Sequence, residues 1–158
     1  MTEKKFLPKD GQVDFTYARY APVINTVVVN GDKILLLHRS NELRLYPGYW
    51  NGISGFLDDT KSIQQKIYEE FKEELGIDKS RVKIKKVGRP FLQEAPEYKK
   101  TWLVVPVLVE AKTTEYRLDW EAQEARWFKL DEIAAIKLMP GYENLIKEFF
   151  PDFIYEKA

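Results

Sequence analysis

Apolar residues occur along this chain in short runs separated by residues that favour turns. Runs at 23–29 and 33–37 flank the tripeptide Asn-Gly-Asp at 30–32. Two apolar runs joined by an Asn-Gly turn are typical of a β-hairpin. Because both runs are almost continuously apolar, we expect both strands to be largely buried.

A helical pattern follows at residues 61–75, where apolar side chains recur at every fourth position: Ile63, Ile67, Phe71 and Leu75. This spacing places the four side chains in one stripe on the surface of an α-helix. Ser62 is a suitable N-cap residue, and Gly76 is a suitable residue to end the helix. The segment is the strongest helix prediction in the chain.

The remaining pattern predicts further strands and two short helices. Strands are expected at 82–87, about 89–94, 101–111 and 126–128, with a turn at 95–97. Helices are expected at 131–136, capped by Asp131, and at 142–150, before Pro151. Residues 40–60 are rich in glycine, and we expect them to form a long irregular connection.

These elements indicate an α+β fold, in which helices flank a mixed β-sheet to give an αβα sandwich. The chain has no internal repeat and no Gly/Ser/Pro-rich linker. We therefore expect one domain over residues 1–158, in which 1–22 form a lead-in segment.

Composition excludes several kinds of site. The 158 residues include no cysteine, which excludes a disulfide scaffold, a cysteine-ligated zinc site and a thiol nucleophile. Lys+Arg and Asp+Glu are both 25, so there is no overall attraction to nucleic acid, and we do not expect such a partner unless a local basic patch exists. No apolar run approaches the ~18 residues of a membrane-spanning helix, and the N-terminus lacks the apolar run of a signal peptide, so we expect a cytoplasmic protein without membrane association.

The helix at 61–75 carries more carboxylates than an ordinary amphipathic helix needs. Rotating about 100° per residue from Ile63 puts Glu70 and Glu74 within about 20° of it, and Glu73 about 80° away. Carboxylates crowded at the edge of a buried face repel one another and lose solvation.

Two interpretations of these acids stay open from the helix alone. In the first, they form a solvated flank that Lys66 and Lys72 screen. In the second, they form a site for a hard divalent cation, because oxygen ligands without histidine or cysteine suit Mg²⁺ or Mn²⁺.

The surrounding segment, GFLDDTKSIQQKIYEEFKEELGI at 55–77, resembles a Nudix box. The family pattern is G-x5-E-x7-R-E-U-x-E-E-x-G-U, in which U is a bulky apolar residue. Seven residues match it in register: Gly55, Glu70, Phe71, Glu73, Glu74, Gly76 and Ile77. Segments YPGYWNGISGF and LDWEAQEARWFKLDEI also resemble family sequence, so the likeness extends over most of residues 23–149.

Two positions of the box depart from the family pattern. Lys61 replaces the first glutamate and Glu69 replaces the arginine. If the two side chains normally meet, the exchange keeps their attraction and inverts its polarity. That inversion is a hypothesis which a double-mutant cycle tests.

The resemblance implies a Mg²⁺-dependent pyrophosphohydrolase, with Mn²⁺ as the other candidate ion. Such enzymes cleave a nucleoside diphosphate linked to another moiety, such as a nucleotide sugar, by attack of metal-activated water on phosphorus. Carried over by residue, it assigns Glu70, Glu73 and Glu74 as catalytic metal ligands. A backbone carbonyl of Ser54 or Gly55 completes the metal site.

The resemblance also suggests residues outside the box. A glutamate from a late loop often assists catalysis in the family, and Glu121 is the first candidate, with Glu124 as the alternative. Arg39 and Arg44 are candidate contacts for substrate phosphates. His38 follows an apolar strand, and we expect it to be packed and hydrogen-bonded.

The altered box keeps a second function open, a non-catalytic Nudix-fold protein that binds nucleotides or regulates. Retention of the three helix acids favours the hydrolase, because a simple binding protein does not need their mutual repulsion. The expected partner in either case is a small nucleotide. A homodimer is a further expectation, because homodimers are common in the family.

Overall fold

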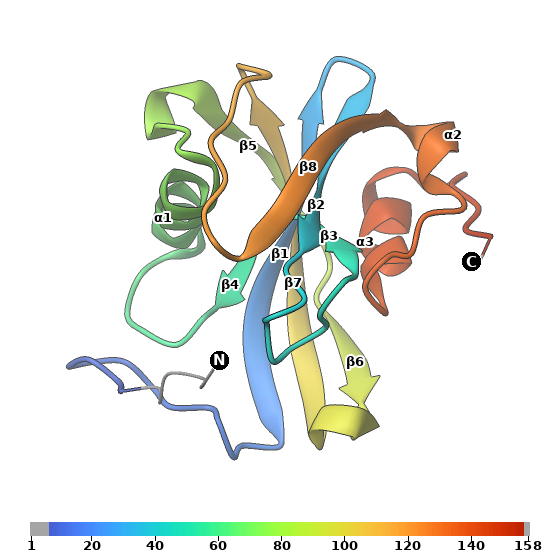
Figure 1. Cartoon of the computed structure of the whole chain (residues 1–158). Helices are drawn as coiled ribbons and strands as arrows, with labels where there is room; N and C mark the ends of the chain where they lie inside the picture. Colours follow the sequence, from blue (N-terminus) through green and yellow to red (C-terminus); the bar gives the residue numbers. More distant parts are fainter. Residues whose placement is uncertain (1–6, 157–158) are drawn as a thin grey trace.

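The computed structural model describes residues 7–156, and the part of the expected lead-in segment before residue 7 lies outside the described residues. Three layers are visible in Figure 1: α1 (Ile63–Leu75) covers one face of a β-sheet, and α3 (Tyr142–Phe149) covers the other. The short helix α2 (Leu130–Ile133) lies on the same side as α3. The predicted αβα sandwich is therefore confirmed.

The centre of the sheet is a long parallel pair. Strands β1 (Tyr20–Asn30) and β7 (Lys100–Ala111) pair in parallel over ten positions, from Tyr20 opposite Thr101 to Val29 opposite Glu110. Strand β2 (Lys33–Arg39) lies antiparallel to β1, as the predicted hairpin requires. Gly31 adopts a left-handed conformation in the connecting turn, which glycine does without steric cost.

The remaining strands extend the sheet on both sides. Its main path runs β3 (Trp50–Asn51), β2, β1, β7, β5 (Val82–Val87), so that β5 is an edge strand. Three more strands pair with single members of this path: β4 (Ser54–Phe56) with β1, β6 (Phe91–Ala95) with β7, and β8 (Ala122–Lys129) with β2. Short 3₁₀ turns occupy Lys79–Arg81 and Pro96–Tyr98.

Several predicted boundaries were wrong. Residues 40–60 are not wholly irregular, because β3 and β4 lie within them and pair with β2 and β1. Strand β8 is longer than the predicted 126–128, since it follows β2 over nearly its whole length. Helix α2 is capped at Lys129 and not at Asp131, because the backbone N–H of Lys129 donates to Glu132 Oε1 at 2.7 Å.

Each face of the sheet has its own apolar core. On one face Ile67, Phe71 and Leu75 of α1 pack against strand residues. On the other face Tyr142, Leu145 and Ile146 of α3 do the same. The predicted stripe of α1 is thus its buried face, and any polar residue close to that stripe is held at the edge of the core.

A buried lysine fixes the segment that leads into β1. Lys100 is 3% exposed, and its ammonium donates to the backbone carbonyls of Phe15, Thr16 and Ala18 at 2.6, 3.2 and 2.7 Å. Burial lowers the pKa of Lys100, while the three carbonyls replace the water that its ammonium has lost. This contact positions the segment before β1 beside the start of β7.

None of the helices in residues 7–156 is long and apolar enough to cross a membrane.

Candidate functional site

Helix α1 begins and ends where the sequence predicts. The Ser62 hydroxyl accepts a hydrogen bond from the backbone N–H of Gln65 at 3.2 Å, and Gln65 Oε1 accepts one from the backbone N–H of Ser62 at 2.8 Å. Gly76 closes the helix in a left-handed conformation. These caps fix the rotation of the helix, and therefore decide which of its acids face the sheet.

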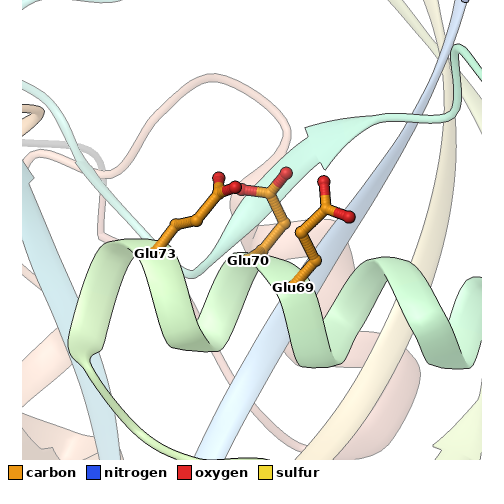
Figure 2. A group of neighbouring side chains, drawn as sticks. All are labelled: Glu69, Glu70 and Glu73. Atoms are coloured by element: carbon orange, nitrogen blue, oxygen red, sulfur yellow. The ribbon is translucent and has the colours of Figure 1, made fainter.

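The acids of α1 form a compact group. Figure 2 shows Glu69, Glu70 and Glu73 on one side of the helix with their carboxylates close together. One oxygen from each lies within 4.8 Å of the others, which is close enough for all three to share one cation. The sequence assigned Glu70, Glu73 and Glu74, so the structure adds Glu69 to the group and places Glu74 differently.

Glu74 is turned toward the interior. It is 7% exposed, and its Oε2 atom has no hydrogen-bond partner among the described residues. Burial raises the pKa of Glu74 well above its ordinary value, and the nearby Glu70 and Glu121 carboxylates raise it further. An unpartnered buried carboxylate is costly unless a proton or a cation compensates it.

Burial disfavours the charged form of Glu70 as well. Burial raises the pKa of Glu70 to about 8, with a further contribution from the Glu73 carboxylate. The group of acids is therefore poorly solvated and mutually repulsive. A divalent cation would convert that repulsion into coordination, and the donor set, made only of carboxylate oxygens, suits Mg²⁺ or Mn²⁺.

Strand β4 lies directly against these acids. A Cβ atom on Gly55 would lie 2.6 Å from Glu70 Oε1, so a larger residue here would displace this carboxylate. The neighbouring Ser54 hydroxyl accepts a hydrogen bond from Asn51 Nδ2 at 3.3 Å. Both residues border the same cavity as the acids.

That cavity has a volume of about 620 Å³ and two chemically different ends. Glu69, Glu70, Glu73 and Glu121 line the acidic end. The other end is largely apolar and aromatic, and its wall includes Phe56, Phe91, Trp102, Val104 and Leu145. A volume of this size is typical of sites for small organic ligands.

A chain of aromatic side chains supports the apolar end. Trp102 Nε1 donates to the Tyr46 hydroxyl at 2.8 Å, and the Tyr98 hydroxyl accepts from the backbone N–H of Tyr46 at 2.7 Å. Tyr46 adopts a left-handed backbone conformation with φ of 51°. A non-glycine residue in that region is held by its surroundings, and here two hydrogen bonds hold it.

Of the two late-loop candidates, Glu121 lines the cavity. Burial raises its pKa, and Asp119 adds to the effect, whereas Arg39 opposes it. Glu124 lies elsewhere, because its carboxylate pairs with His38 Nδ1 at 3.4 Å and with Arg126 Nη2 at 3.1 Å. His38 itself stacks on Trp50 with ring centroids 4.7 Å apart, which agrees with the packed role expected from the sequence.

Both candidate arginines border the cavity, in different settings. Arg39 is half-buried and donates to the backbone carbonyls of Leu45 and Tyr46, with Nη2 2.8 Å from the Leu45 oxygen. Burial lowers the pKa of Arg39, and the Glu121 and Glu74 carboxylates counteract that effect. Arg44 is exposed on the loop that Arg39 holds. Arg39 therefore shapes the cavity wall, and Arg44 lies at its mouth.

The two departures from the family pattern meet in space. Lys61 Nζ and Glu69 Oε2 form an ion pair, so the exchanged residues attract each other with inverted polarity. Lys66 is not a solvated screen but is 5% exposed, and its ammonium contacts Asp58 at 3.3 Å and Asp59 at 2.9 Å. Lys61 and Lys66 thus lie beside the acidic end of the cavity, near the N-terminal end of α1.

The apolar half of the cavity was not found from the sequence. Tyr46, Phe91 and Trp102 come from a loop and two different strands, and each looks like an ordinary core residue in its own segment. Their common location depends on strand pairing of β6 with β7, in which Phe91 lies opposite Val104. The only sequence indication was the density of aromatic residues, 14% of the chain.

Comparison with known proteins agrees with this geometry. The family model of the NUDIX domain matches residues 19–149. The uncharacterized Nudix hydrolase YvcI of Bacillus subtilis is 22% identical over 124 residues, which cover 78% of this chain and 75% of that protein. The NAD-capped RNA hydrolase NudC of Stutzerimonas stutzeri is 25% identical over 142 residues, which cover 85% of this chain and 45% of NudC.

The chain therefore spans less than half the length of NudC. Among solved structures, the MutT protein from Methanosarcina mazei Go1 superposes with a TM-score of 0.69 at 21% identity, over 86% of this chain and 96% of that one. A structural likeness at this identity shows the fold, and the family match covers most of the chain. This chain belongs to the NUDIX domain family and is a hydrolase that acts on phosphoanhydride bonds.

Proposed function

We propose that this hydrolase cleaves a nucleoside diphosphate linked to another moiety, such as a nucleotide sugar or a dinucleotide. One observation carries the proposal: a single cavity of about 620 Å³ joins the carboxylate group of α1 to a pocket walled by Phe56, Phe91 and Trp102. Aromatic walls suit a nucleobase, because such rings stack on its faces. The carboxylates at the acidic end would repel a diphosphate, so this end suits a diphosphate only when a bound cation offsets the negative charge of both.

The carboxylates of Glu69, Glu70 and Glu73 would hold a divalent ion, Mg²⁺ or Mn²⁺, with a backbone carbonyl of Ser54 or Gly55 as a further ligand. When bound, such an ion lowers the pKa of a coordinated water and neutralises phosphate oxygens. Glu74, which the family resemblance also assigns as a ligand, lies close to Glu70 and Glu121, and a cation in the site would offset the cost of its buried, unpartnered oxygen.

Glu121 is proposed to accept the proton of the attacking water. It reaches the cavity from the loop before β8, which is a different element from α1. Its burial raises the pKa of the carboxyl group, and a carboxylate with a raised pKa is a stronger base. Arg39, whose charge faces Glu121 and Glu74, limits that rise and holds the wall of the cavity.

Arg44 is proposed to contact the phosphates at the mouth of the cavity. Its guanidinium offers several donors in a plane that matches phosphate oxygens. Because Arg44 is exposed on the loop after β2, it can approach a ligand without first giving up a buried position.

The test is a hydrolysis screen over nucleotide sugars, dinucleotides and nucleoside triphosphates, with products separated by ion exchange. Turnover should require Mg²⁺ or Mn²⁺ and should fall at least 100-fold in the double variant Glu73→Gln/Glu74→Gln. Lys72→Gln, an exposed change on the same helix, is the matched control and should retain activity. Binding of a nucleotide without turnover of any compound would contradict catalysis and favour the non-catalytic alternative.

A further inference from the structure

A group of exposed cations follows the edge of the sheet. Six of the eleven residues from 79 to 89 are Lys or Arg, and all six are exposed. We refer to them as the basic edge: Lys79, Arg81, Lys83, Lys85, Lys86 and Arg89. The balanced total of 25 cations and 25 anions conceals this local segregation of charge.

The basic edge has little compensating negative charge. No acidic residue occurs between residues 79 and 93, and within residues 7–156 none of the six side chains forms an ion pair. Two acids close to the basic edge accept hydrogen bonds from other groups: Asp78 accepts from the Ser80 hydroxyl, and Glu148 accepts from the backbone N–H of Arg89. Glu110 lies opposite Lys83 in the strand register.

The cations are arranged along a line. Strand β5 is six residues long and therefore extends over ~20 Å. Val82 and Ile84 point toward the core beneath α1, whereas Lys83 and Lys86 pair with Glu110 and Leu108 on the other face. A bulge between Ile84 and Lys86 leaves Lys85 outside the regular pairing. Among the described strands, none lies beside the outer side of β5 in the main path of the sheet.

A loop connects the basic edge to the catalytic cavity. The backbone N–H of Lys112 donates to the carbonyl of Arg81 at 2.8 Å, and the chain then continues to Trp120 and Glu121, which line the cavity. In Figure 1 this loop descends between α1 and β8. A second hollow of about 380 Å³ lies along it, lined by Arg81 and Arg117 together with Asp78 and Glu115.

We infer that the basic edge binds the phosphate backbone of a single-stranded nucleic acid whose end lies toward the catalytic cavity. Charge complementarity is the main argument, because a linear polyanion matches a row of exposed cations that form no ion pairs within the described residues. Trp120 is 66% exposed at the rim of the cavity and offers a face for an unpaired base. This inference goes beyond the proposed hydrolysis, since binding along β5 requires neither a metal ion nor turnover.

Lysine on an edge strand also discourages pairing with other chains. That role accounts for the three lysines on β5. It does not account for Lys79, Arg81 and Arg89, which continue the row beyond both ends of the strand. Only the inferred role predicts that the protein binds nucleic acid and that this binding weakens as salt rises, so a binding measurement distinguishes the two roles.

The test measures fluorescence anisotropy of a labelled 20-nucleotide oligo(U) RNA with metal-free protein in EDTA, over a series of salt concentrations. EDTA removes hydrolysis from the experiment, so the result is independent of the proposed catalysis. Wild-type protein should bind with an affinity that falls as salt rises. The variant Lys83→Gln/Lys85→Gln/Lys86→Gln should lose at least tenfold in affinity and should reduce the salt slope by about 2.

A matched variant carries the same change in charge on other elements. Lys33→Gln/Lys129→Gln/Lys147→Gln alters three exposed lysines on β2, β8 and α3, and it should bind RNA as the wild type does. The variant Arg81→Gln/Arg89→Gln lies outside β5, so it tests the basic edge even if the triple variant folds poorly. Melting temperatures of all variants verify folding.

Two results would overturn the inference. The first is equal RNA affinity in the basic-edge variants and the matched control, which would leave edge protection as the role of the lysines. The second is binding to vesicles of anionic phospholipid without binding to RNA, which would make the surface a membrane contact. Equal binding of duplex and single-stranded RNA would contradict the single-stranded part of the inference.

Discussion

The carboxylate of Glu70 lies directly against the bare backbone of Gly55. This is a contact between a helix and a strand in which glycine is required for space and not for backbone conformation, because a Cβ atom there would lie 2.6 Å from Glu70 Oε1. The atoms that would clash belong to the end of a flexible side chain. The chain can therefore tolerate the clash by moving that carboxylate, and the movement would disturb the proposed metal site.

The substitution Gly55→Ala should consequently separate activity from stability. We expect hydrolysis to fall at least tenfold, while the melting temperature changes by no more than about 2 °C. The hairpin glycine is the opposite control: Gly31→Ala meets no neighbouring atom but places a side chain at positive φ, so it should lower stability by about 1 kcal/mol and leave kcat unchanged. Equal losses of activity and stability in Gly55→Ala would contradict the steric argument.

The inverted ion pair gives a second prediction. Lys61→Glu places a carboxylate against Glu69 and Asp59 and should lower the melting temperature. Adding Glu69→Arg restores an attractive pair in the family polarity and should recover most of the loss. Thermal unfolding of the wild type, both single variants and the double variant forms the cycle, and additive effects would show that the two side chains do not interact.

The buried lysine of α1 gives a third prediction. Lys66→Met keeps the length of the side chain but leaves the buried Asp58 without its ammonium partner, so stability should fall by about 3 kcal/mol. The second substitution Asp58→Asn removes the unpaired charge and should recover part of the loss. Urea unfolding measures both, with the exposed Lys72→Met as the matched control. A loss of the same size in Lys72→Met would indicate a general effect of helix charge.

The raised pKa of Glu70 predicts how stability depends on pH in the metal-free protein. The folded pKa is about 8 and the ordinary value is 4.5, so between these values the folded state holds a proton that the unfolded state has released. Stability should therefore decline as pH rises through this window. Glu70→Gln removes this contribution and should be about 4 kcal/mol more stable than the wild type at pH 8, with little difference near pH 4.

Urea unfolding in EDTA at several pH values measures this difference. Repeating the measurement with Mg²⁺ supplies the control, because a bound cation should stabilise the wild type and leave Glu70→Gln with little or no advantage. If the wild type and Glu70→Gln show the same pH dependence of the unfolding free energy without metal, Glu70 is not the group whose protonation stabilises the folded protein.

The sequence predicted those parts of the site that depend on local periodicity. The fourfold spacing of Ile63, Ile67, Phe71 and Leu75 determines which side of α1 is buried, and this determines where Glu70 and Glu74 lie. The same pattern could not show that Glu69 joins the group, since its position depends on contacts with Lys61. The family resemblance indicated the approximate position in the chain of a further acid, and Glu121, the first of the two candidates, lines the cavity.

Strands β3 and β4 were missed for a physical reason. They are two and three residues long, which is too short for an alternating pattern, and they are extended because β2 and β1 supply hydrogen-bond partners. The apolar half of the cavity was missed because Tyr46, Phe91 and Trp102 meet only through tertiary structure. The local sequence predicts α1 and its acids, but it does not predict the apolar wall on the other side of the cavity.

The parallel pairing of β1 with β7 has a consequence for the synthesis of the chain. Each of the ten positions in that ladder joins residues about 80 apart, such as Tyr20 with Thr101. A ribosome must therefore release residue 110 before the central ladder can be complete, and contacts over such separations form slowly. Until then β1, with its apolar residues, lacks its longest partner, and the nascent protein is most exposed to aggregation during that interval.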